Sequence, residues 1–304
     1  MKTLSFKNRE PFYKRISRNT SSYLFMAPFA IVFLVFNILP IFTAIYYSFT
    51  SFNVLEDPIF IGADNYLKLF TSGDLFLKSL KNTLVIAGII GPVGYILSFL
   101  FAWCINELPR LLRALLTLIF YAPTLTNLFA IWKIFFSGDS YGIVNSYLNQ
   151  LGIINDPIMW LQNSHYIFAV IIIILLWASL GTSFLAFIAG LQTVDVSLYE
   201  AGAIDGVHNR FQELWFITLP AMKPQLLFGA IMSISSSFGV GDLITAVVGM
   251  PSPSYSVHTL VHYLQDYGFT RFEMGYACCV AVILFGLMVG ANKLIQSMIR
   301  RIGH

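Results

Sequence analysis

The sequence predicts an all-α membrane protein with six transmembrane helices and with both termini in the cytoplasm. Of the 304 residues, 57% are hydrophobic and only 11% are charged, whereas soluble domains carry about 25% charged residues. The chain contains six long apolar runs, and its Lys and Arg residues are concentrated on one side of them. These features exclude a soluble globular protein, and a net charge of +3 is too small to indicate a nucleic-acid partner.

The six uncharged runs approach or exceed the length needed to cross the hydrocarbon core of a bilayer, about 20 helical residues. Backbone groups in lipid must satisfy their own hydrogen bonds, so these runs are predicted to be helices. Barrel strands would be shorter and would alternate apolar with polar residues. The runs are residues 23–49, 82–106, 114–132, 166–194, 225–241 with an apolar continuation to 250, and 274–292.

The basic residues set the predicted orientation, because cytoplasmic connections are enriched in Lys and Arg. With six spans, the two termini and the connections after spans 2 and 4 share one side. That side carries 13 of the 18 Lys and Arg residues, and the other side carries five. We therefore expect the connection between spans 4 and 5 to lie in the cytoplasm.

The predicted spans divide the chain into a tail, a first helix, an outer segment and a core. The first span is too long for the apolar part of a cleaved signal peptide, so we expect an uncleaved signal anchor. A short interfacial helix is expected near residues 66–70. The predicted parts are a basic cytoplasmic tail at 1–22, the first span at 23–49, an outer segment at 50–78, a transmembrane core at 79–298 that includes a cytoplasmic segment at 195–224, and a cytoplasmic tail at 299–304.

Several chemical functions find no support in the sequence. The chain has no phosphate-binding loop of the type G-x-x-x-x-G-K-[ST], so an energy source would be a gradient or another polypeptide. Cys104, Cys278 and Cys279 lie in apolar runs and are expected to be buried hydrophobic residues. His258 and His262 lack further metal ligands nearby, so we expect them to be solvated or part of a docking surface. No metal site and no resident cofactor are predicted.

The cytoplasmic stretch "LYEAGAIDGVHNRFQELWFITLPAMKP" contains signals for two short helices. Ser197 and Glu200 fit an S-x-x-E capping box at a helix start. Asp205-Gly206 is a helix stop, since Gly adopts the left-handed conformation that ends helices. Asn209 is a candidate cap for a second helix, and Leu219-Pro220 breaks the chain before span 5. A plain capped linker is the alternative, but a linker needs neither small residues on one face nor a glycine turn.

This stretch resembles the "EAA" signature of permease subunits in bacterial binding-protein-dependent ABC importers, and the sugar-type permeases in particular. Similar pieces occur at "FNILPIFTAIYYSFTSF", "FIGADNYLKLF", "KNTL" and "LAFIAGLQTVDVSLYEAGAIDG". The resemblance covers residues 23–300. Two features depart from the signature. Its third position is Gly202, where the family usually has Ala or another small residue. The spacing from Gly206 to Ile217 is one residue longer than in the usual pattern. We expect the extra residue in the turn near His208.

The resemblance implies a type I ABC importer permease fold and a role for the cytoplasmic segment. In this family the two short helices couple the permease to a separate ATPase, and small residues allow close docking. Glu200 either caps its own helix or pairs with a basic group of the ATPase. The residues implied in coupling are Glu200, Ala201, Gly202, Asp205, Gly206, Leu219 and Pro220.

The resemblance also implies the partners. They are a second, homologous permease that would form a heterodimer, two ATPase subunits that bind ATP and Mg, and a lipid-anchored or periplasmic substrate-binding protein outside the cell. The location implied is the bacterial cell membrane, in contact with its lipid. A sugar, and in particular an oligosaccharide, is the expected substrate.

Polar and aromatic residues within the spans are candidates for the substrate pathway, because intramembrane polar groups are often functional. Sugar sites combine aromatic faces with hydrogen-bonding groups. Helix packing is the alternative role of each Ser, and Asp242 is alternatively a residue at the outer end of its span. The candidates are Asn127, Trp132, Trp177, Ser179, Ser183, Ser236 and Asp242.

Two other classes of protein were weighed against the importer permease. An ion-gradient-driven secondary transporter typically has inverted repeats and several midplane acids, and here Asp242 is the one such acid. A membrane enzyme needs clustered catalytic groups, but the histidines fall on both predicted sides of the membrane. The importer permease is the favoured hypothesis.

Overall fold

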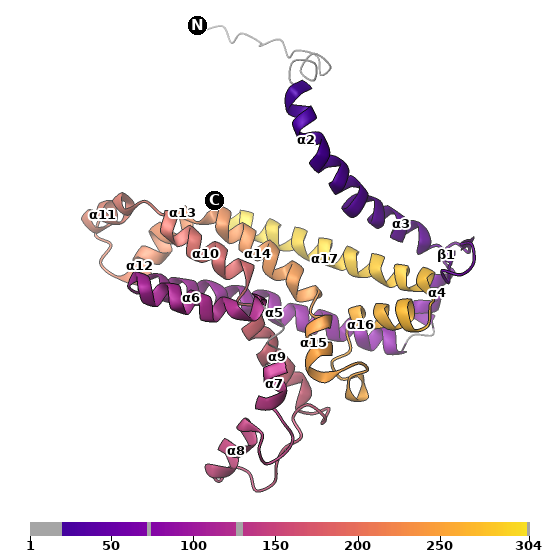
Figure 1. Ribbon diagram of the computed structural model, residues 1–304. Coiled ribbons are helices and arrows are strands. Elements are labelled where there is room, and N and C mark those ends of the chain that lie inside the picture. The colour runs from indigo at the N-terminus through magenta and orange to yellow at the C-terminus, as the bar shows by residue number, and fades with distance from the viewer. Residues whose placement is uncertain (1–19, 72–73, 126–129, 303–304) are drawn as a thin grey trace.

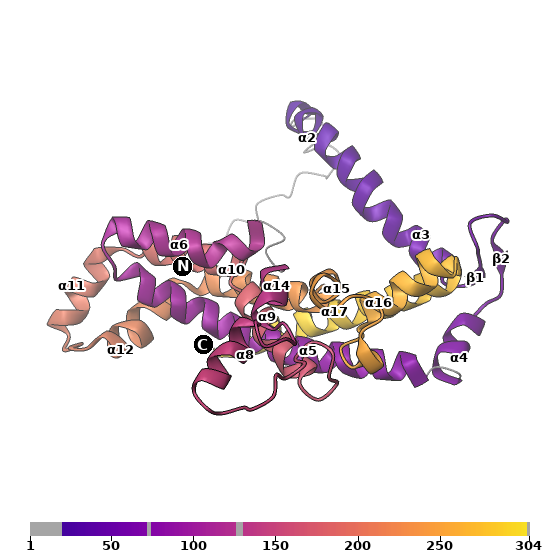
Figure 2. The same ribbon diagram turned by 60° about the horizontal axis from the view of Figure 1, so that its bottom comes forward.

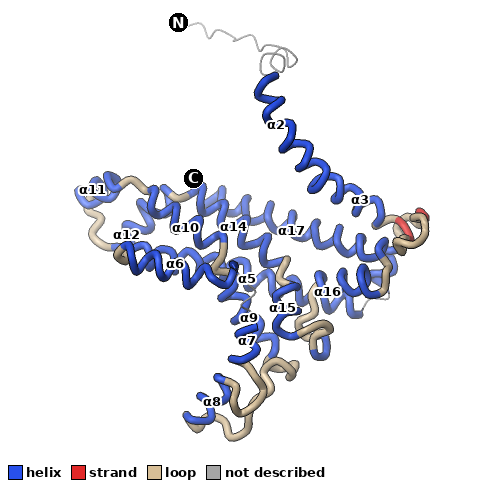
Figure 3. The backbone as a smooth tube through the Cα atoms, in the orientation of Figure 1, coloured by secondary structure: helices blue, strands red, loops and turns tan. Residues whose placement is uncertain are grey.

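The computed structural model of the protein describes residues 20–71, 74–125 and 130–302. The described part of the chain is mostly helical, with loops between the helices (Figure 3). Strands β1 (Thr50–Ser51) and β2 (Ile59–Phe60) form a small antiparallel pair, in which Thr50 lies opposite Phe60. The prediction of a helical membrane protein is confirmed, since long apolar helices make up the body of the molecule.

The first span stands apart from the rest of the chain. It consists of α2 (Thr20–Phe33), the π-helix η1 (Leu34–Ile38) and α3 (Leu39–Tyr47). No residue of these three elements is buried, although the run is strongly apolar. Figures 1 and 2 show it leaving the bundle at the end of α3 and projecting away. A 28-residue apolar helix in this position needs lipid or another protein around it.

The outer segment is fastened to the end of the first span. Helix α4 (Asp64–Thr71) confirms the short helix expected near residues 66–70. The buried Asn65 donates hydrogen bonds from Nδ2 to the carbonyl oxygens of Ser48 and Thr50, both at 2.9 Å. The Tyr66 hydroxyl donates to Ser48 Oγ at 2.8 Å. These bonds fix α4 on the turn that follows α3.

Five long helices form the core. They are α5 (Asp74–Asn106), α9 (Ile167–Ala178), α10 (Thr182–Thr193), α14 (Lys223–Phe238) and α17 (Met274–Ile302). Helix α5 packs on α14, α10 and α9 (Figure 1). The fully buried Phe184 and Phe187 of α10 fill the space beside Phe99 of α5. Gly229 leaves room for the Phe187 ring, so α14 approaches α10 closely.

The remaining helices lie between these five along the chain, and α6, with 16 residues, is as long as α14. Those on the membrane and outer side are α6 (Arg110–Leu125), α7 (Ala130–Phe135), α8 (Ile143–Gln150), α15 (Gly241–Val248), η3 (Pro253–Tyr255), α16 (Leu260–Gln265) and η4 (Asp266–Thr270). Those of the segment 195–224 are α11 (Val196–Ile204), α12 (Arg210–Glu213), η2 (Leu214–Thr218) and α13 (Leu219–Ala221).

The described residues contain four helices long and apolar enough to cross a membrane, and a fifth if one bent pair counts as a span. The four are Thr20–Tyr47, Asp74–Asn106, Ile167–Thr193 and Met274–Met298, and the pair is Arg210–Ala221 with Lys223–Phe238, bent by 82°. The predicted span 114–132 corresponds to α6 and α7, with 126–129 outside the described residues. The exact number of six therefore stays a prediction.

The apolar continuation predicted after the fifth span is a separate helix. Helix α14 ends at Phe238, and Gly239 caps it with its N–H bonded to the Ser236 carbonyl. Helix α15 then begins at Gly241, where a Cβ atom would lie 2.6 Å from Cγ1 of Val261, so only a glycine allows this close approach to α16. Two glycines close together thus end one helix and start another.

The elements on the two predicted sides lie at opposite ends of the bundle. Helices α11 and α12 lie at one end, and β1, α4 and α16 lie at the other (Figure 1). Helix α8 projects from the bundle beyond α7 and α9. The segment 195–224 is thus separated from the segments after spans 1 and 5, and which end faces the cytoplasm stays a prediction.

The expectation of solvated histidines is wrong. His258 and His262 are each 2% exposed, and their rings stack with centroids 5.2 Å apart. His262 Nδ1 accepts a hydrogen bond from the Thr259 backbone N–H at 3.0 Å and so completes a capping box at the start of α16. Asn82 Nδ2 of α5 donates to the His258 carbonyl at 2.9 Å. The pair is buried because α16 is fastened onto α5.

The cysteines differ in their surroundings. Cys279 is buried and Cys278 is half-buried, as expected for small hydrophobic residues. Cys104 instead is exposed within this chain, on the face of α5 that points away from the bundle. Among the described residues, no group of three or more His, Cys, Asp or Glu side chains is placed to hold a metal ion.

Candidate functional site

The candidate site is the segment 195–224, here called the elbow, which consists of two short helical arms. Its first arm, α11, begins at Asp195, whose carboxylate accepts a hydrogen bond from the Ser197 backbone N–H at 3.0 Å. This bond lowers the pKa of Asp195. The predicted capping box of Ser197 and Glu200 is therefore wrong. Asp195 precedes the first apolar residue of the helix, where Asp is a preferred cap, and takes that place.

The first arm ends at Gly206, as the sequence predicts. Gly206 has a φ of +93°, a conformation that residues with a side chain rarely adopt. The Val207 N–H bonds to the Gly202 carbonyl at 2.9 Å, and the Gly206 N–H bonds to the Ala203 carbonyl at 3.4 Å. These two bonds form a Schellman motif, which closes the helix and turns the chain sharply.

The second arm begins at Asn209, also as predicted. Asn209 Oδ1 accepts a hydrogen bond from the Gln212 N–H at 2.8 Å. Residues 214–218 form the π-helix η2, in which the Leu219 N–H bonds to the Leu214 carbonyl five residues back. A π-turn accommodates one residue more than an α-turn, so the second arm contains an extra residue of its own. The extra residue expected in the turn near His208 stays a prediction.

The two arms are packed on one another through two pairs of residues. A Cβ atom on Gly202 would lie 2.6 Å from Cδ1 of Ile217, so this glycine gives close contact inside the elbow. The Tyr199 hydroxyl shares a hydrogen bond of 2.9 Å with the Thr218 hydroxyl, and Thr218 is buried. The elbow is therefore a closed unit and not a flexible linker.

The outer face of the first arm is free. Glu200, Ala201, Ala203 and Asp205 are exposed, and the Ile204 side chain is 87% exposed. Within the described part of the chain, Glu200 forms no hydrogen bond or ion pair. Of the predicted small residues, only Gly202 is buried. The arm thus presents two carboxylates, two alanines and an isoleucine to its surroundings.

Leu219 and Pro220 lie where the elbow joins the membrane helices. Leu219 is half-buried. Pro220 lies in the first turn of α13, a position where proline, which lacks an N–H, is tolerated. The chain then bends by 82° into α14. A break before span 5 is present as predicted, but it falls at Met222 and not at Leu219-Pro220, which lie within the helical run Arg210–Ala221.

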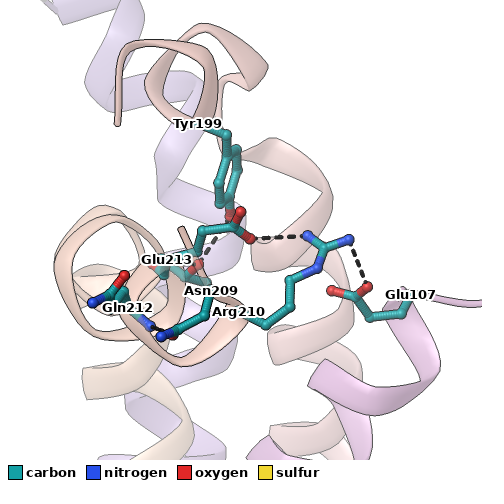
Figure 4. A network of polar contacts seen from close by, with 7 residues as sticks. Glu107, Tyr199, Asn209, Arg210, Gln212 and Glu213 are labelled. Carbon is teal, nitrogen blue, oxygen red and sulfur yellow. Dashed lines mark hydrogen bonds and ion pairs between the residues drawn. The ribbon is translucent and has the colours of Figure 1, made fainter. Parts of the chain in front are cut away.

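A charged network, which the sequence analysis did not predict, ties the second arm to the membrane helices. Arg210 forms ion pairs with Glu213 of the same arm at 2.9 Å and with Glu107 at 3.0 Å (Figure 4). Glu107 follows the last residue of α5. The Phe211 and Trp103 rings contact one another beside this network, with centroids 5.7 Å apart. No sequence pattern relates residues that lie about a hundred positions apart.

The candidates for the substrate pathway do not form one cluster. Trp132 and Trp177 lie edge to face with ring centroids 5.2 Å apart, and Trp132 Nε1 is buried without a partner in the described part of the chain. The serines make helix contacts: Ser179 Oγ donates to the Leu176 carbonyl, Ser183 Oγ to the Gly229 carbonyl, and Ser236 Oγ to the Ser233 carbonyl. Asn127 lies outside the described residues.

Asp242 lies in the first turn of α15 and is exposed. Its carboxylate accepts a hydrogen bond from Gln265 Nε2 at 3.0 Å. Gln265 is the last residue of α16. Asp242 thus belongs to the contact between α15 and α16.

The geometry defines a multi-pass helical membrane protein with a rigid elbow between two of its spans. Residues 94–302 match the family described as binding-protein-dependent transport system inner membrane component. The chain belongs to this family of ABC transporter permease subunits, which are not themselves enzymes.

Relatives of known name support this assignment and place the chain with the sugar-type permeases. It is 32% identical over 286 residues to the probable ABC transporter permease protein YesP of Bacillus subtilis (strain 168), covering 91% of this chain and 89% of YesP. It is 31% identical over 284 residues to the arabinooligosaccharides transport system permease protein AraP of the same organism, covering 91% and 86%.

A solved structure shows the same fold. A chain of a bacterial ABC transporter involved in the import of the acidic polysaccharide alginate superposes with a TM-score of 0.78 at 23% sequence identity. The match covers 97% of this chain and 100% of that one. At this identity the likeness concerns the fold alone.

Proposed function

We propose that the chain is one permease subunit of an ATP-driven importer and forms half of a pathway for a carbohydrate. In this proposal it has six transmembrane helices, lies in the bacterial cell membrane, and keeps both termini in the cytoplasm. The elbow receives mechanical work from a separate ATPase. The ATPase, and not this chain, binds ATP and Mg and hydrolyses the nucleotide.

One observation carries the proposal: a permease of this family presents a rigid elbow whose outer face is empty. Capping by Asp195, the turn at Gly206 and the contact of Gly202 with Ile217 hold the two arms in a fixed relation. A rigid unit transmits a displacement that a flexible loop would absorb. The unpaired carboxylate of Glu200 and the small side chains of Ala201 and Ala203 leave room for a protein surface with a basic group.

The named relatives support an oligosaccharide as the substrate. AraP is named for arabinooligosaccharides, and a lactose transport system permease protein, LacF of Rhizobium radiobacter, is 29% identical over 285 residues. Trp132 and Trp177 supply aromatic faces of the kind that sugars stack on. We propose these two residues as the first candidates for contact with the sugar.

The proposed partners follow from the same sources. A related alginate transporter was solved in complex with an alginate pentasaccharide-bound periplasmic protein, which supports a lipid-anchored or periplasmic binding protein that delivers the sugar here. The exposed first span supports a second, homologous permease, because a helix that contacts so little of its own chain is available to a neighbour. Two ATPase copies would serve the two elbows of such a heterodimer.

Reconstitution in liposomes tests the proposal. The chain, its second permease, the ATPase and the binding protein are purified together, and uptake of labelled arabinooligosaccharides is measured. We expect uptake with ATP and none with ADP or with a non-hydrolysable analogue. Uptake that continues without ATP and stops when ion gradients are collapsed would instead identify a secondary transporter.

Two substitutions test the part played by the elbow. Glu200→Trp and Gly206→Trp place a bulky side chain on the outer face of the first arm or in its turn. We expect each variant to hydrolyse ATP without uptake or to lose binding of the ATPase. Wild-type uptake in both variants would contradict the coupling role, even if uptake itself depends on ATP.

A further inference from the structure

The second arm of the elbow touches the inner end of α5 through two adjacent residues. Arg210 Nη2 lies 3.0 Å from Glu107 Oε2, and the Phe211 ring lies against the Trp103 ring. One contact is ionic and the other is aromatic. Figure 4 shows the Arg210 guanidinium between Glu107 and Glu213. One side chain thus pairs with the end of α5 and with another residue of its own arm.

The inner end of α5 is itself well ordered by its neighbours. The Arg113 side chain of α6 donates a hydrogen bond to Asn106 Oδ1 at 3.2 Å and so closes the turn between α5 and α6. Helix α5 packs on α14, α10, α9 and α16, and therefore touches most of the core. A displacement applied at Glu107 and Trp103 acts directly on this helix.

The covalent connections of the elbow are poorly suited to pass on such a displacement. On one side the chain bends by 82° between α13 and α14, directly after the π-helix η2. On the other side Val194 and Asp195 are extended and join α10 to α11 without a continuous helix. Both joints are places where a helix can change direction.

A cavity of about 420 Å³ lies between the elbow and the inner ends of the core helices. Its walls include Trp103, Glu107, Arg113, Gln192, Tyr199 and Arg210. Leu214 and Leu219 of the second arm pack against the apolar cluster that contains Phe99, Ala102 and Ile105 of α5, so the cavity separates only part of the elbow from α5. The ion pair of Arg210 and the ring contact of Phe211 bridge this hollow.

We propose that Arg210 and Phe211 are positioning residues that link the elbow to α5, so that movement of the elbow moves α5 as well as its covalent neighbours. This inference rests on the proposed coupling role of the elbow. Glu107 and Trp103 are the receiving residues on α5. The link is adjustable because an exposed ion pair can break and re-form as the elbow turns.

The test measures the number of sugar molecules taken up per ATP hydrolysed in the reconstituted complex. Glu107→Gln removes the charge on α5 and keeps the size of the side chain. We expect a two- to fivefold lower ratio, the range set by one exposed ion pair. Glu107→Gln with Phe211→Ala removes both contacts and should lower the ratio further. Glu213→Gln leaves Arg210 bonded to Glu107 and should lower it less than Glu107→Gln.

The matched control breaks an ion pair of similar exposure at the other end of the molecule. Lys68 Nζ lies 3.1 Å from Glu273 Oε2, and the two side chains are 53% and 45% exposed, compared with 65% and 40% for Arg210 and Glu107. Glu273→Gln should leave the ratio unchanged.

Salt gives a readout that a merely structural role would not move. The screening length falls from about 8 Å at physiological salt to about 3 Å at 1 M. The wild-type ratio should therefore fall toward that of Glu107→Gln as salt rises. The ratio of Glu107→Gln itself should depend less on salt.

Cys104 gives a direct readout of α5, because it is exposed and follows Trp103. A fluorophore is attached to Cys104 in a complex without other reactive cysteines, and its emission is compared with and without ATP. We expect an ATP-dependent change in the wild type and in Glu273→Gln. The change should be reduced in Glu107→Gln and lost in the variant that also carries Phe211→Ala.

The outcomes separate the two proposals. A wild-type complex without ATP-dependent uptake overturns the proposed function. A wild-type complex that transports, with Glu107→Gln and the double variant keeping both its ratio and its Cys104 signal, overturns the link to α5 alone. If the double variant does not assemble, Glu107→Gln decides, since it changes one charge on a side chain that is 40% exposed.

Discussion

Gly202 and Ile217 meet where the two arms of the elbow cross. A Cβ atom on Gly202 would lie 2.6 Å from Cδ1 of Ile217 and 3.7 Å from its Cγ1. The first distance is too short for any real contact, and the second is an ordinary one. The relation between the arms thus depends on a missing side chain on one arm and on a single terminal methyl group of the other.

The first prediction follows from these two distances. Gly202→Ala should force the arms apart or push the Ile217 methyl group aside, at a cost of about 1–3 kcal/mol for overpacking. Ile217→Val removes only Cδ1, so the double variant Gly202→Ala with Ile217→Val should recover most of that loss. Thermal unfolding of the purified complex measures stability, and uptake per ATP measures coupling.

The double-mutant cycle for this pair decides the prediction. A favourable interaction energy between the two substitutions is expected, since the residues touch. Strictly additive losses would show that Gly202 and Ile217 do not share one contact, and the packing of the elbow would then have to be different.

The second prediction concerns the turn at Gly206. Gly206→Ala puts a side chain at a φ of +93°, which costs on the order of 1–2 kcal/mol, although nothing lies within 4 Å of the added Cβ atom. Gly152→Ala is the matched control, because Gly152 has a φ of +70° and equally open surroundings, in the outer segment far from the elbow. We expect both to lower stability, and only Gly206→Ala to lower uptake per ATP.

The third prediction concerns the start of the first arm. Asp195→Ala removes the carboxylate that accepts the Ser197 N–H, and loss of such a cap costs about 1 kcal/mol. Asp195→Ser retains an acceptor and should behave like the wild type. Hydrogen exchange of the amides in the first turn of α11 measures the effect: faster exchange in Asp195→Ala alone is expected, and equal exchange in all three proteins would contradict the cap.

The sequence predicted the class of fold, the end of the first arm and the start of the second arm, because local features determine each of them. Apolar runs indicate transmembrane helices because in lipid every backbone N–H and C=O group must be hydrogen-bonded within the protein. Gly206 and Asn209 were identified correctly because a left-handed turn and a helix cap are decided by neighbouring residues. Asp195 carried the same kind of local signal, but Ser197 and Glu200 offered a competing pattern, and the competing pattern proved wrong.

The remaining features depend on contacts between distant segments. His258 is buried where Asn82 donates a hydrogen bond to its carbonyl across the fold, and the ion pair between Glu107 and Arg210 joins the connection after α5 to the elbow. The π-helix η2 could not be placed because a longer spacing does not show which turn of a helix holds an extra residue. Packing decides all three.

The fourth prediction concerns acid stability on the outer side. Burial, together with the neighbouring His262, lowers the pKa of His258 from 6.5 to about 4; Lys78 lowers it further and Asp266 opposes the shift. The folded protein therefore holds His258 neutral where the unfolded chain would protonate it. Its contribution to stability is complete above pH 6.5 and is lost as the pH falls toward 4, by as much as about 3 kcal/mol.

Unfolding temperatures of the purified chain between pH 7.5 and pH 4 measure this contribution. His258→Gln should weaken the loss of stability over the range from pH 6.5 to pH 4. His165→Gln, at an exposed histidine, should leave the profile unchanged. Identical profiles for the wild type and His258→Gln would show that the imidazole is not held neutral in the fold.

The most direct test of the account is a cross-linking measurement on the outer face of the first arm. A photoreactive residue is placed at Ala203 in the assembled transporter, and cross-linked products are compared in the nucleotide-free, ATP-bound and ADP-bound states. We expect a product with the ATPase subunit, with a yield that changes between nucleotide states. If an intact, transporting complex gives no ATPase product from Ala203 in any state, the elbow does not receive the ATPase and the account is contradicted.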